Sequence, residues 1–320
     1  MGNASTSASG EDVIILGCVA YSEEISTIWE GMRQYFLRAG VPFDFVMFTS
    51  YDRQMEALVN GHIDIAWNGP LAHVRLHKRT KGKCISMGMR DCDRDFSTHL
   101  IVPKDSPIQS ISDLRGKRIA TGAYDSPQAY LMPLQAIQDS PDGEAILKSL
   151  TIVRFDRDLG KHGDTAAGEL EVLRALSEGE VEAGFVSDVM WQRALAAGDV
   201  NQKKKPQMRA VPGVVPAFDH CQFDAMPTLS EKKRLAFANA LFAMSMADPD
   251  QKRVMKSEGI RDRWMPHREE GYQAMHRALA SEEPAPFPGA VDTEEKHRFA
   301  ALELRPTVGF PNTKFVRACT

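Results

Sequence analysis

The chain has 320 residues, of which 43% are hydrophobic and 26% charged, and its formal net charge is −4. This length allows two lobes, each with its own core. A net negative charge excludes a general attraction to nucleic acid or acidic membranes, so no nucleic-acid partner is expected. No apolar run approaches the ~20 residues that span a bilayer, so no integral membrane segment is expected either.

The first ten residues are small and polar and lack the basic and apolar regions of a signal peptide, so we interpret them as a flexible leader. The five cysteines are scattered, without metal-type spacing, and no cofactor is expected.

His73 and His77 lie four residues apart on an expected helix. Their neighbours are basic, and no carboxylate or thiol stands at matching spacing. This favours a solvated helix face, and no metal site is expected.

Strand-like and helix-like segments alternate along most of the chain. Apolar runs predict strands at 13–20, 43–48, 63–67, 98–102, 118–121, 150–155 and 183–186. Amphipathic spacing predicts helices at 22–39, 53–60, 70–78, 126–137, 169–176 and 189–196, and then at 230–246, 248–257 and 267–279. Such alternation implies an α/β fold with mostly parallel sheets and flanking helices.

Three strand-to-helix junctions share one composition. Tyr21 and Ser22 follow the first strand, Asn68 precedes Gly69-Pro70, and Ser126 precedes Pro127-Gln128. Ser22, Asn68 and Ser126 are each plausible N-caps, and Pro is common just inside a helix. Ligands of open parallel sheets bind at such junctions, where free helix N–H groups favour an anion. Ordinary capped helix starts have the same composition, so the junctions alone do not show whether the chain binds a ligand.

Four segments in order, at 60–70, 100–116, 126–133 and 178–184, together resemble the phosphate/phosphite/phosphonate substrate-binding proteins of ABC transporters. Residues 60–70 (NGHIDIAWNGP) are similar to that family's G-x-V-D-I-A-x-x-G-P stretch, and residues 100–116 (LIVPKDSPIQSISDLRG) to the stretch that enters its second lobe. Residues 126–133 (SPQAYLMP) stand where the family has a serine-rich anion-binding turn. Residues 178–184 (EGEVEAG) resemble a second G-x-V-D-a motif. The likeness covers about residues 13–245.

The resemblance implies a two-lobed type 2 periplasmic-binding fold that closes on its ligand by hinge motion. We expect a leader at 1–10, lobe 1 at 11–97 plus 215–282, lobe 2 at 98–214, and a C-terminal arm at 283–320 packed on the body. Two hinge strands would lie near 96–98 and 212–218. The implied function is a solute-binding protein that closes around a small anion, with an ABC permease as partner.

The resemblance also implies ligand-binding residues in the cleft. Asn68 follows the strand after which relatives place a ligand-contacting side chain, Ser126 matches the first serine of the anion turn, and His162 falls where relatives often have a histidine. Asp188 and His220 occupy other cleft-facing positions. Topology alone adds Tyr21 and Tyr51, and Gln128 stands where relatives have a hydroxyl.

Other ligands and activities stay open. Pro127 lacks an N–H and Gln128 replaces a hydroxyl, so a carboxylate, a sulfonate or an uncharged polar metabolite is an alternative to phosphonate.

The same fold also serves cytosolic enzymes and sensors. His162 with Asp164, or His220 with Cys221 and Asp219, could form an acid–base or nucleophilic pair. Adjacent strand residues point to opposite faces, however, which argues against direct cooperation of His220 with Cys221. The resemblance implies a periplasmic location, and the lack of a signal peptide pattern leaves a cytoplasmic one open.

Overall fold

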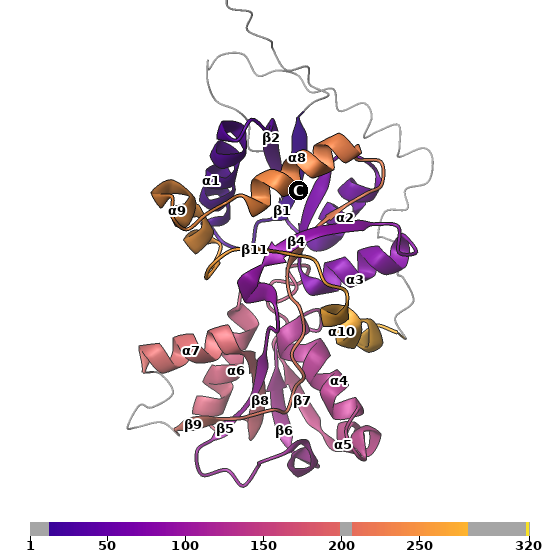
Figure 1. Ribbon diagram of the computed structural model, residues 1–320. Coiled ribbons are helices and arrows are strands. Elements are labelled where there is room, and N and C mark those ends of the chain that lie inside the picture. Colours follow the sequence, from indigo (N-terminus) through magenta and orange to yellow (C-terminus); the bar gives the residue numbers. More distant parts are fainter. Residues whose placement is uncertain (1–12, 199–206, 281–317, 320) are drawn as a thin grey trace, which may run out of the picture.

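The computed structural model describes residues 13–198, 207–280 and 318–319. They form two lobes, each built around its own β-sheet and joined at a narrow waist (Figure 1). The two-lobed α/β fold expected from the sequence is confirmed. The expected leader and nearly all of the expected C-terminal arm lie outside the described residues. No helix in the described ranges is both long and apolar enough to cross a membrane.

Lobe 1 contains the seven-stranded sheet, in the order β11-β4-β10-β3-β1-β2-β12. Its strands are β1 (Ile14–Val19), β2 (Phe43–Phe48), β3 (Ile65–Asn68), β4 (Ile85–Arg90), β10 (Gln222–Ala225), β11 (Trp264–Pro266) and β12 (Ala318–Cys319). Its helices are α1 (Ile25–Arg38), α2 (Tyr51–Val59), α3 (Pro70–Arg79), α8 (Glu231–Phe242) and α9 (Pro249–Ser257).

The core of lobe 1 follows from the alternation of buried strands and amphipathic helices. Helix α1 buries Trp29, Met32 and Phe36 at helical spacing against the sheet. The Phe36 ring stacks on Phe237 of α8, with ring centroids 4.9 Å apart. Helices from both ends of the chain therefore enclose one hydrophobic core, which positions the carboxyl ends of β1 and β3 at the waist.

Lobe 2 contains the five-stranded sheet, in the order β7-β6-β8-β5-β9. Its strands are β5 (Thr98–Pro103), β6 (Arg118–Thr121), β7 (Thr151–Arg154), β8 (Ala183–Ser187) and β9 (Met208–Val211). Its helices are α4 (Met132–Gln138), α5 (Gly143–Ser149), α6 (Ala167–Ser177) and α7 (Asp188–Ala197). A single π-helical turn, Pro127–Leu131, leads into α4, and Ser126 caps it by accepting a hydrogen bond from the Ala129 N–H at 3.2 Å.

Two segments cross the waist, one between β4 and β5 and the other between β9 and β10. They pair in antiparallel fashion: the Phe96 N–H donates to the Phe218 carbonyl at 2.7 Å, and the Phe218 N–H donates back at 3.0 Å. Helix α10 (Gln273–Ala278) lies beside the waist and contacts both α3 of lobe 1 and α4 of lobe 2 (Figure 1). We propose that the paired segments are the hinge.

Several local expectations were wrong. Both sheets are mixed rather than mostly parallel, because β4, β5, β9, β10 and β11 pair in antiparallel fashion. Ser22 is not an N-cap, since α1 begins after Glu24, and Gly69 rather than Asn68 caps α3. His73 does not lie on a solvated face, since its side chain is fully buried.

Candidate ligand site between the lobes

The 157–166 loop of lobe 2, between β7 and α6, contacts the start of α2 in lobe 1. The Tyr51 N–H donates to the Gly160 carbonyl at 2.9 Å. The Tyr51 ring stacks on the His162 imidazole, with ring centroids 4.5 Å apart, and its hydroxyl donates a short hydrogen bond to Asp164. Tyr51 and His162 are each only 1% exposed. This contact therefore closes the interface between the lobes.

His162 is the most unusual group at this interface. Its side chain is buried, and neither ring nitrogen has a hydrogen-bond partner among the described residues. Burial lowers the pKa of His162 well below its ordinary value, and the nearby positive charge of Arg75 lowers it further. Leaving a buried polar group unpaired costs about 1–3 kcal/mol, so both nitrogens are poised to bind a group that enters from solvent.

Asp164 is a half-buried carboxyl group two residues from His162 in the chain. Burial raises its pKa to about 7, although the Tyr51 hydroxyl and the Arg90 charge act in the opposite direction. Asp125 lies on the same side of the site, where its carboxylate accepts from the Gly160 N–H at 2.7 Å, and burial raises its pKa as well. The site therefore combines acidic groups with an electrically neutral imidazole.

Ser126 and Gln128 support the 157–166 loop from within lobe 2, and both are buried. The Gln128 side-chain amide donates to the Gly163 carbonyl at 3.1 Å and to Glu169 at 3.2 Å. A Cβ on Gly163 would lie 2.4 Å from the Ser126 hydroxyl oxygen, so only glycine allows the loop to come this close. Ser126 accepts one hydrogen bond from its own helix, and its hydroxyl hydrogen remains available to donate.

Tyr21 lies at the end of β1, half-buried, on the lobe 1 side of the interface. Burial raises its pKa well above the ordinary value, and so do the nearby carboxylates of Glu258 and Asp164. Arg90, the nearby cation, is already paired: it donates to Asp93 at 2.6 Å and to Glu258 at 3.3 Å. The positive charge of Arg90 is therefore paired with carboxylates of its own lobe.

The structure turns Asn68 into lobe 1 rather than toward a ligand. Its side chain is fully buried in lobe 1, where it donates to Asp224 at 2.9 Å and accepts from Gln54 at 2.8 Å. Asp224 also accepts from Ser86 at 2.8 Å and pairs with His73 at 3.1 Å. Asn68 therefore holds β3 to β10 in a buried hydrogen-bond network.

His220 and Asp188 also have partners within the protein. His220 is buried next to the hinge pair, 4.4 Å from the Phe96 ring, and burial lowers its pKa to about 4. Its Nδ1 lies 3.0 Å from the Cys221 thiol, so the expectation that these neighbours point apart was wrong, because both precede β10. Asp188 begins α7 and accepts from His99 at 2.8 Å.

The structure thus brings Tyr51, Ser126, Gln128 and His162 together, with Tyr21 nearby, and leaves Asn68, Asp188 and His220 in other environments. Sequence reasoning did not identify Gly160 or Arg75 as parts of the site. The run Gly160-Lys161-His162-Gly163 could have indicated a tight loop, because glycines flank the histidine. Nothing in the local sequence signals that Arg75, on a helix of the other lobe, lies near His162.

The fold resembles that of several solved structures. PhnD1 of Prochlorococcus marinus, solved with methylphosphonate, superposes with a TM-score of 0.63 at 14% identity, covering 84% of this chain and 97% of that one. XAC2383 of Xanthomonas citri, solved with ATP, gives 0.63 at 18% identity, covering 85% and 100%. The periplasmic aliphatic sulphonate-binding protein SsuA of Escherichia coli gives 0.56 at 15% identity, covering 89% and 96%.

At these identities the solved structures establish the fold alone. A family model supplies the stronger evidence: residues 19–272 match the model described as ABC transporter, phosphonate, periplasmic substrate-binding protein. The match extends over both lobes, both segments that cross the waist and the 157–166 loop. The chain therefore belongs to the family of periplasmic phosphonate substrate-binding proteins of ABC transporters.

Proposed function

We propose that this chain binds a small oxyanion of the phosphonate or sulfonate class between its lobes, and that His162 donates to it directly. The main observation behind this proposal is the buried imidazole of His162, whose two nitrogens have no hydrogen-bond partner among the described residues. An oxyanion accepts a hydrogen bond from the single N–H of this neutral ring, and a charge-assisted bond contributes about 1.5–3 kcal/mol. Separation of the lobes would admit the ligand, and closure would bury it.

The charges around the interface support an anion of low charge. Arg75 is close enough to lower the pKa of His162, and the same positive charge attracts an anion. Asp164 and Asp125 oppose a dianion whenever they are ionised, but the pKa of Asp164 is raised to about 7. A singly charged phosphonate or sulfonate therefore fits better than a fully ionised phosphate.

The contacts favour binding over catalysis. His162 and Asp164 both contact Tyr51 rather than each other, so they do not form an acid–base pair in this closed arrangement. Burial raises the pKa of the Cys221 thiol well above its ordinary value, which leaves it a poor nucleophile beside His220. Transport through an ABC permease is the role of the family, and we propose it for this chain.

The test is isothermal titration calorimetry with methylphosphonate, phosphate, methanesulfonate and acetate, on wild-type protein and His162→Phe. Phenylalanine keeps an aromatic ring against Tyr51 but removes both ring nitrogens. We expect the variant to bind the preferred anion at least about tenfold more weakly, since 1.4 kcal/mol corresponds to a factor of ten.

His62→Phe is the matched control, because His62 is exposed in lobe 1, away from the interface. Wild-type affinity in His162→Phe would remove His162 from the site.

A further inference from the structure

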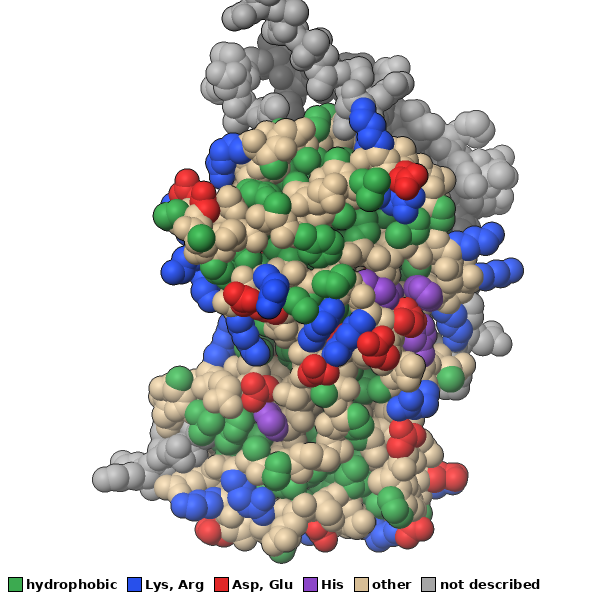
Figure 2. All heavy atoms as spheres, viewed as in Figure 1, with side chains coloured by type: hydrophobic (Ala, Val, Ile, Leu, Met, Phe, Trp, Pro, Cys, Tyr) green, Lys and Arg blue, Asp and Glu red, His purple; other side chains and the backbone are tan. Residues whose placement is uncertain are grey.

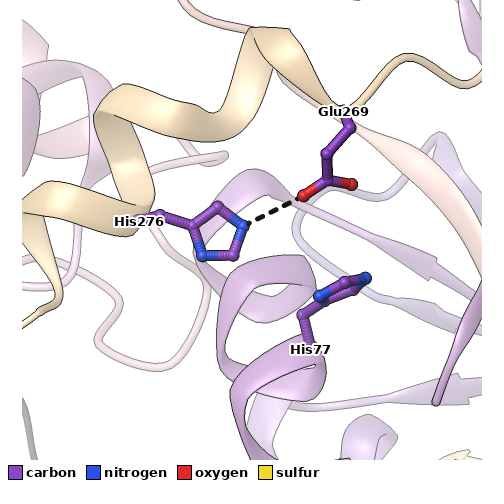
Figure 3. Close-up of side chains that lie close together, drawn as sticks. All are labelled: His77, Glu269 and His276. Carbon is purple, nitrogen blue, oxygen red and sulfur yellow. Dashed lines mark ion pairs between the residues drawn. The ribbon is translucent and has the colours of Figure 1, made fainter. Parts of the chain in front are cut away.

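A second group of side chains converges beside the waist, on the surface formed by α3 and α10. Figure 3 shows three side chains that converge: His77 from α3, Glu269 from the segment before α10, and His276 from α10. One ligand atom from each lies within 4.8 Å of the other two. In the space-filling view, histidine side chains gather over these helices (Figure 2). We name this group, His77, Glu269 and His276, the α3–α10 cluster.

The spacing of the α3–α10 cluster suits a metal ion. Zn²⁺ binds nitrogen and oxygen ligands at about 2.0–2.2 Å, which at a tetrahedral angle places neighbouring ligand atoms about 3.3 Å apart. His276 Nε2 and Glu269 Oε1 are 3.5 Å apart, close to this separation. His77 lies within the 4.8 Å limit and is half-buried at a helix surface, so a side-chain rotation can bring it in.

The chemistry of these groups supports the geometry. His276 Nε2 is shielded from solvent, and at 3.5 Å from Glu269 Oε1 it forms an ion pair rather than a close hydrogen bond. An imidazole nitrogen in its neutral form has a lone pair that can coordinate a divalent metal ion. Glu269 adds a carboxylate, the oxygen ligand that Zn²⁺ commonly takes beside imidazoles.

The carboxylate of Glu269 is also held in place by a neighbour. His267 Nε2 lies 3.2 Å from the second oxygen, Oε2, while His267 Nδ1 lies 2.5 Å from the Gln222 side-chain oxygen. Carboxylates and histidines that ligate metals are commonly oriented by such outer contacts, which fix the geometry of the ligands. Oε1 of Glu269 is thereby directed toward His276, as the ion pair drawn in Figure 3 shows.

We propose that His77, Glu269 and His276 bind a divalent transition metal ion, with Zn²⁺ as the best match, and so join α3 to α10. Two imidazoles and one carboxylate match a zinc site with three protein ligands and one open position. The site lies outside the ligand interface, on the side of the waist where α10 contacts both lobes. It does not depend on the proposed oxyanion function.

A competing cluster exists at the hinge. Asp93, His220 and Cys221 also present ligand atoms within 4.8 Å of one another, and all three are buried. Asp93 is, however, already paired with Arg90, whose Nη2 and Nε lie 2.8 and 2.6 Å from its two oxygens. Burial also raises the pKa of the Cys221 thiol well above its ordinary value, which disfavours the thiolate a metal needs. The α3–α10 cluster is therefore the better site.

The experiment uses the full chain without a histidine tag, stripped of metal with a chelator and titrated with Zn²⁺ against a chromophoric competitor. We expect one equivalent to bind at micromolar protein concentration, and Co²⁺ to give the visible absorption of a tetrahedral site. His77→Ala, Glu269→Gln and His276→Ala should each weaken binding at least about tenfold, since even outer partners of a metal site typically cost 10–100-fold.

His62→Ala serves as the matched control, because His62 is exposed and belongs to neither group of possible ligands, and it should bind as wild type does. Circular dichroism shows whether each variant is folded, so that loss of binding is assigned to the ligands. Wild-type Zn²⁺ affinity in both folded histidine variants would overturn the proposal, as would loss of binding in Cys221→Ser alone. Weak binding of several equivalents, equal in all variants, would show adventitious surface binding and overturn it too.

Discussion

At the scale of single residues, the interface depends on one tyrosine and the two groups that it contacts. Tyr51 stacks on His162 and donates to Asp164, so one side chain of lobe 1 contacts two side chains of lobe 2. The pKa of Asp164 is about 7 in this closed arrangement, against an ordinary value near 3.8 when the carboxyl is exposed. Closure of the lobes is therefore linked to binding of a proton.

The sign of this linkage predicts a pH-dependent closure. A carboxyl whose pKa is raised by closure favours the closed form fully below about pH 4, and this contribution is lost as the pH rises through about 7. We expect the radius of gyration of ligand-free protein, measured by small-angle scattering, to increase between about pH 5 and about pH 8, because the pKa of Asp164 lies within this range. Using ligand-free protein avoids the titration of the ligand itself.

Two variants make this prediction specific. Asp164→Asn removes the titrating group, so its scattering should no longer change over the same pH range. Tyr51→Phe removes the hydrogen bond that lowers the pKa of Asp164, so the transition should move to higher pH. A wild-type pH response in Asp164→Asn would assign the effect to another group.

At the scale of elements, the 157–166 loop determines how closely the lobes approach. Asp158, Gly160, His162, Gly163 and Ala166 all have positive φ, so the loop is folded back on itself. The turn brings Gly160 against the N-cap of α2, where a Cβ on Gly160 would lie 2.9 Å from the Ser50 Cβ. A loop of this shape requires glycine at the point of contact.

Gly160→Ala should therefore weaken ligand binding. The added methyl group meets Ser50 only when the lobes are closed, while the left-handed backbone costs about 1–2 kcal/mol in either state. Gly179→Ala is the matched control, since Gly179 has φ of 71° but no atom within 4 Å of its would-be Cβ. Both variants should lose thermal stability, but calorimetry should show a reduced anion affinity only in Gly160→Ala. Equal affinities would mean that this contact does not limit closure.

Sequence patterns predicted the elements with strong periodicity and missed those without it. The helix α1 and the strand β2 are close to their expected bounds, because their apolar residues recur at helical or strand spacing. Strand β10 was missed because its sequence, Gln-Phe-Asp-Ala, is short and polar. That omission also misplaced Asn68, whose partner Asp224 stands on β10. Local sequence could not show that His77 and His276 meet, since only tertiary packing joins them.

At the scale of the whole molecule, one hydrophobic cluster connects the lobes beside the waist. It contains Leu71 and Val74 of α3, Tyr272 and Met275 near α10, and lobe 2 residues that include Leu100, Ile119 and Met132. Tyr272 and Met275 are fully buried within it. The lobes share this core in addition to the hinge pair, so we expect them to unfold together.

This expectation can be tested in urea with two probes. Trp29, Trp67 and Trp264 lie in lobe 1 and Trp191 in lobe 2, so fluorescence reports mainly on lobe 1 while circular dichroism reports on both. The two unfolding curves of the wild type should coincide. Met275→Ala removes a buried side chain from the shared cluster, a change that costs about 2–5 kcal/mol, and should separate the curves.

Leu176→Ala is the matched control for this prediction. Leu176 is also fully buried, but its hydrophobic cluster contains residues of lobe 2 only. The substitution removes a side chain of similar size, so it should destabilise by a similar amount while the two curves still move together, because the connection between the lobes remains intact. If the curves stayed coincident in Met275→Ala, the hinge pair of Phe96 and Phe218 would be sufficient to couple the lobes, and α10 would contribute stability without cooperativity.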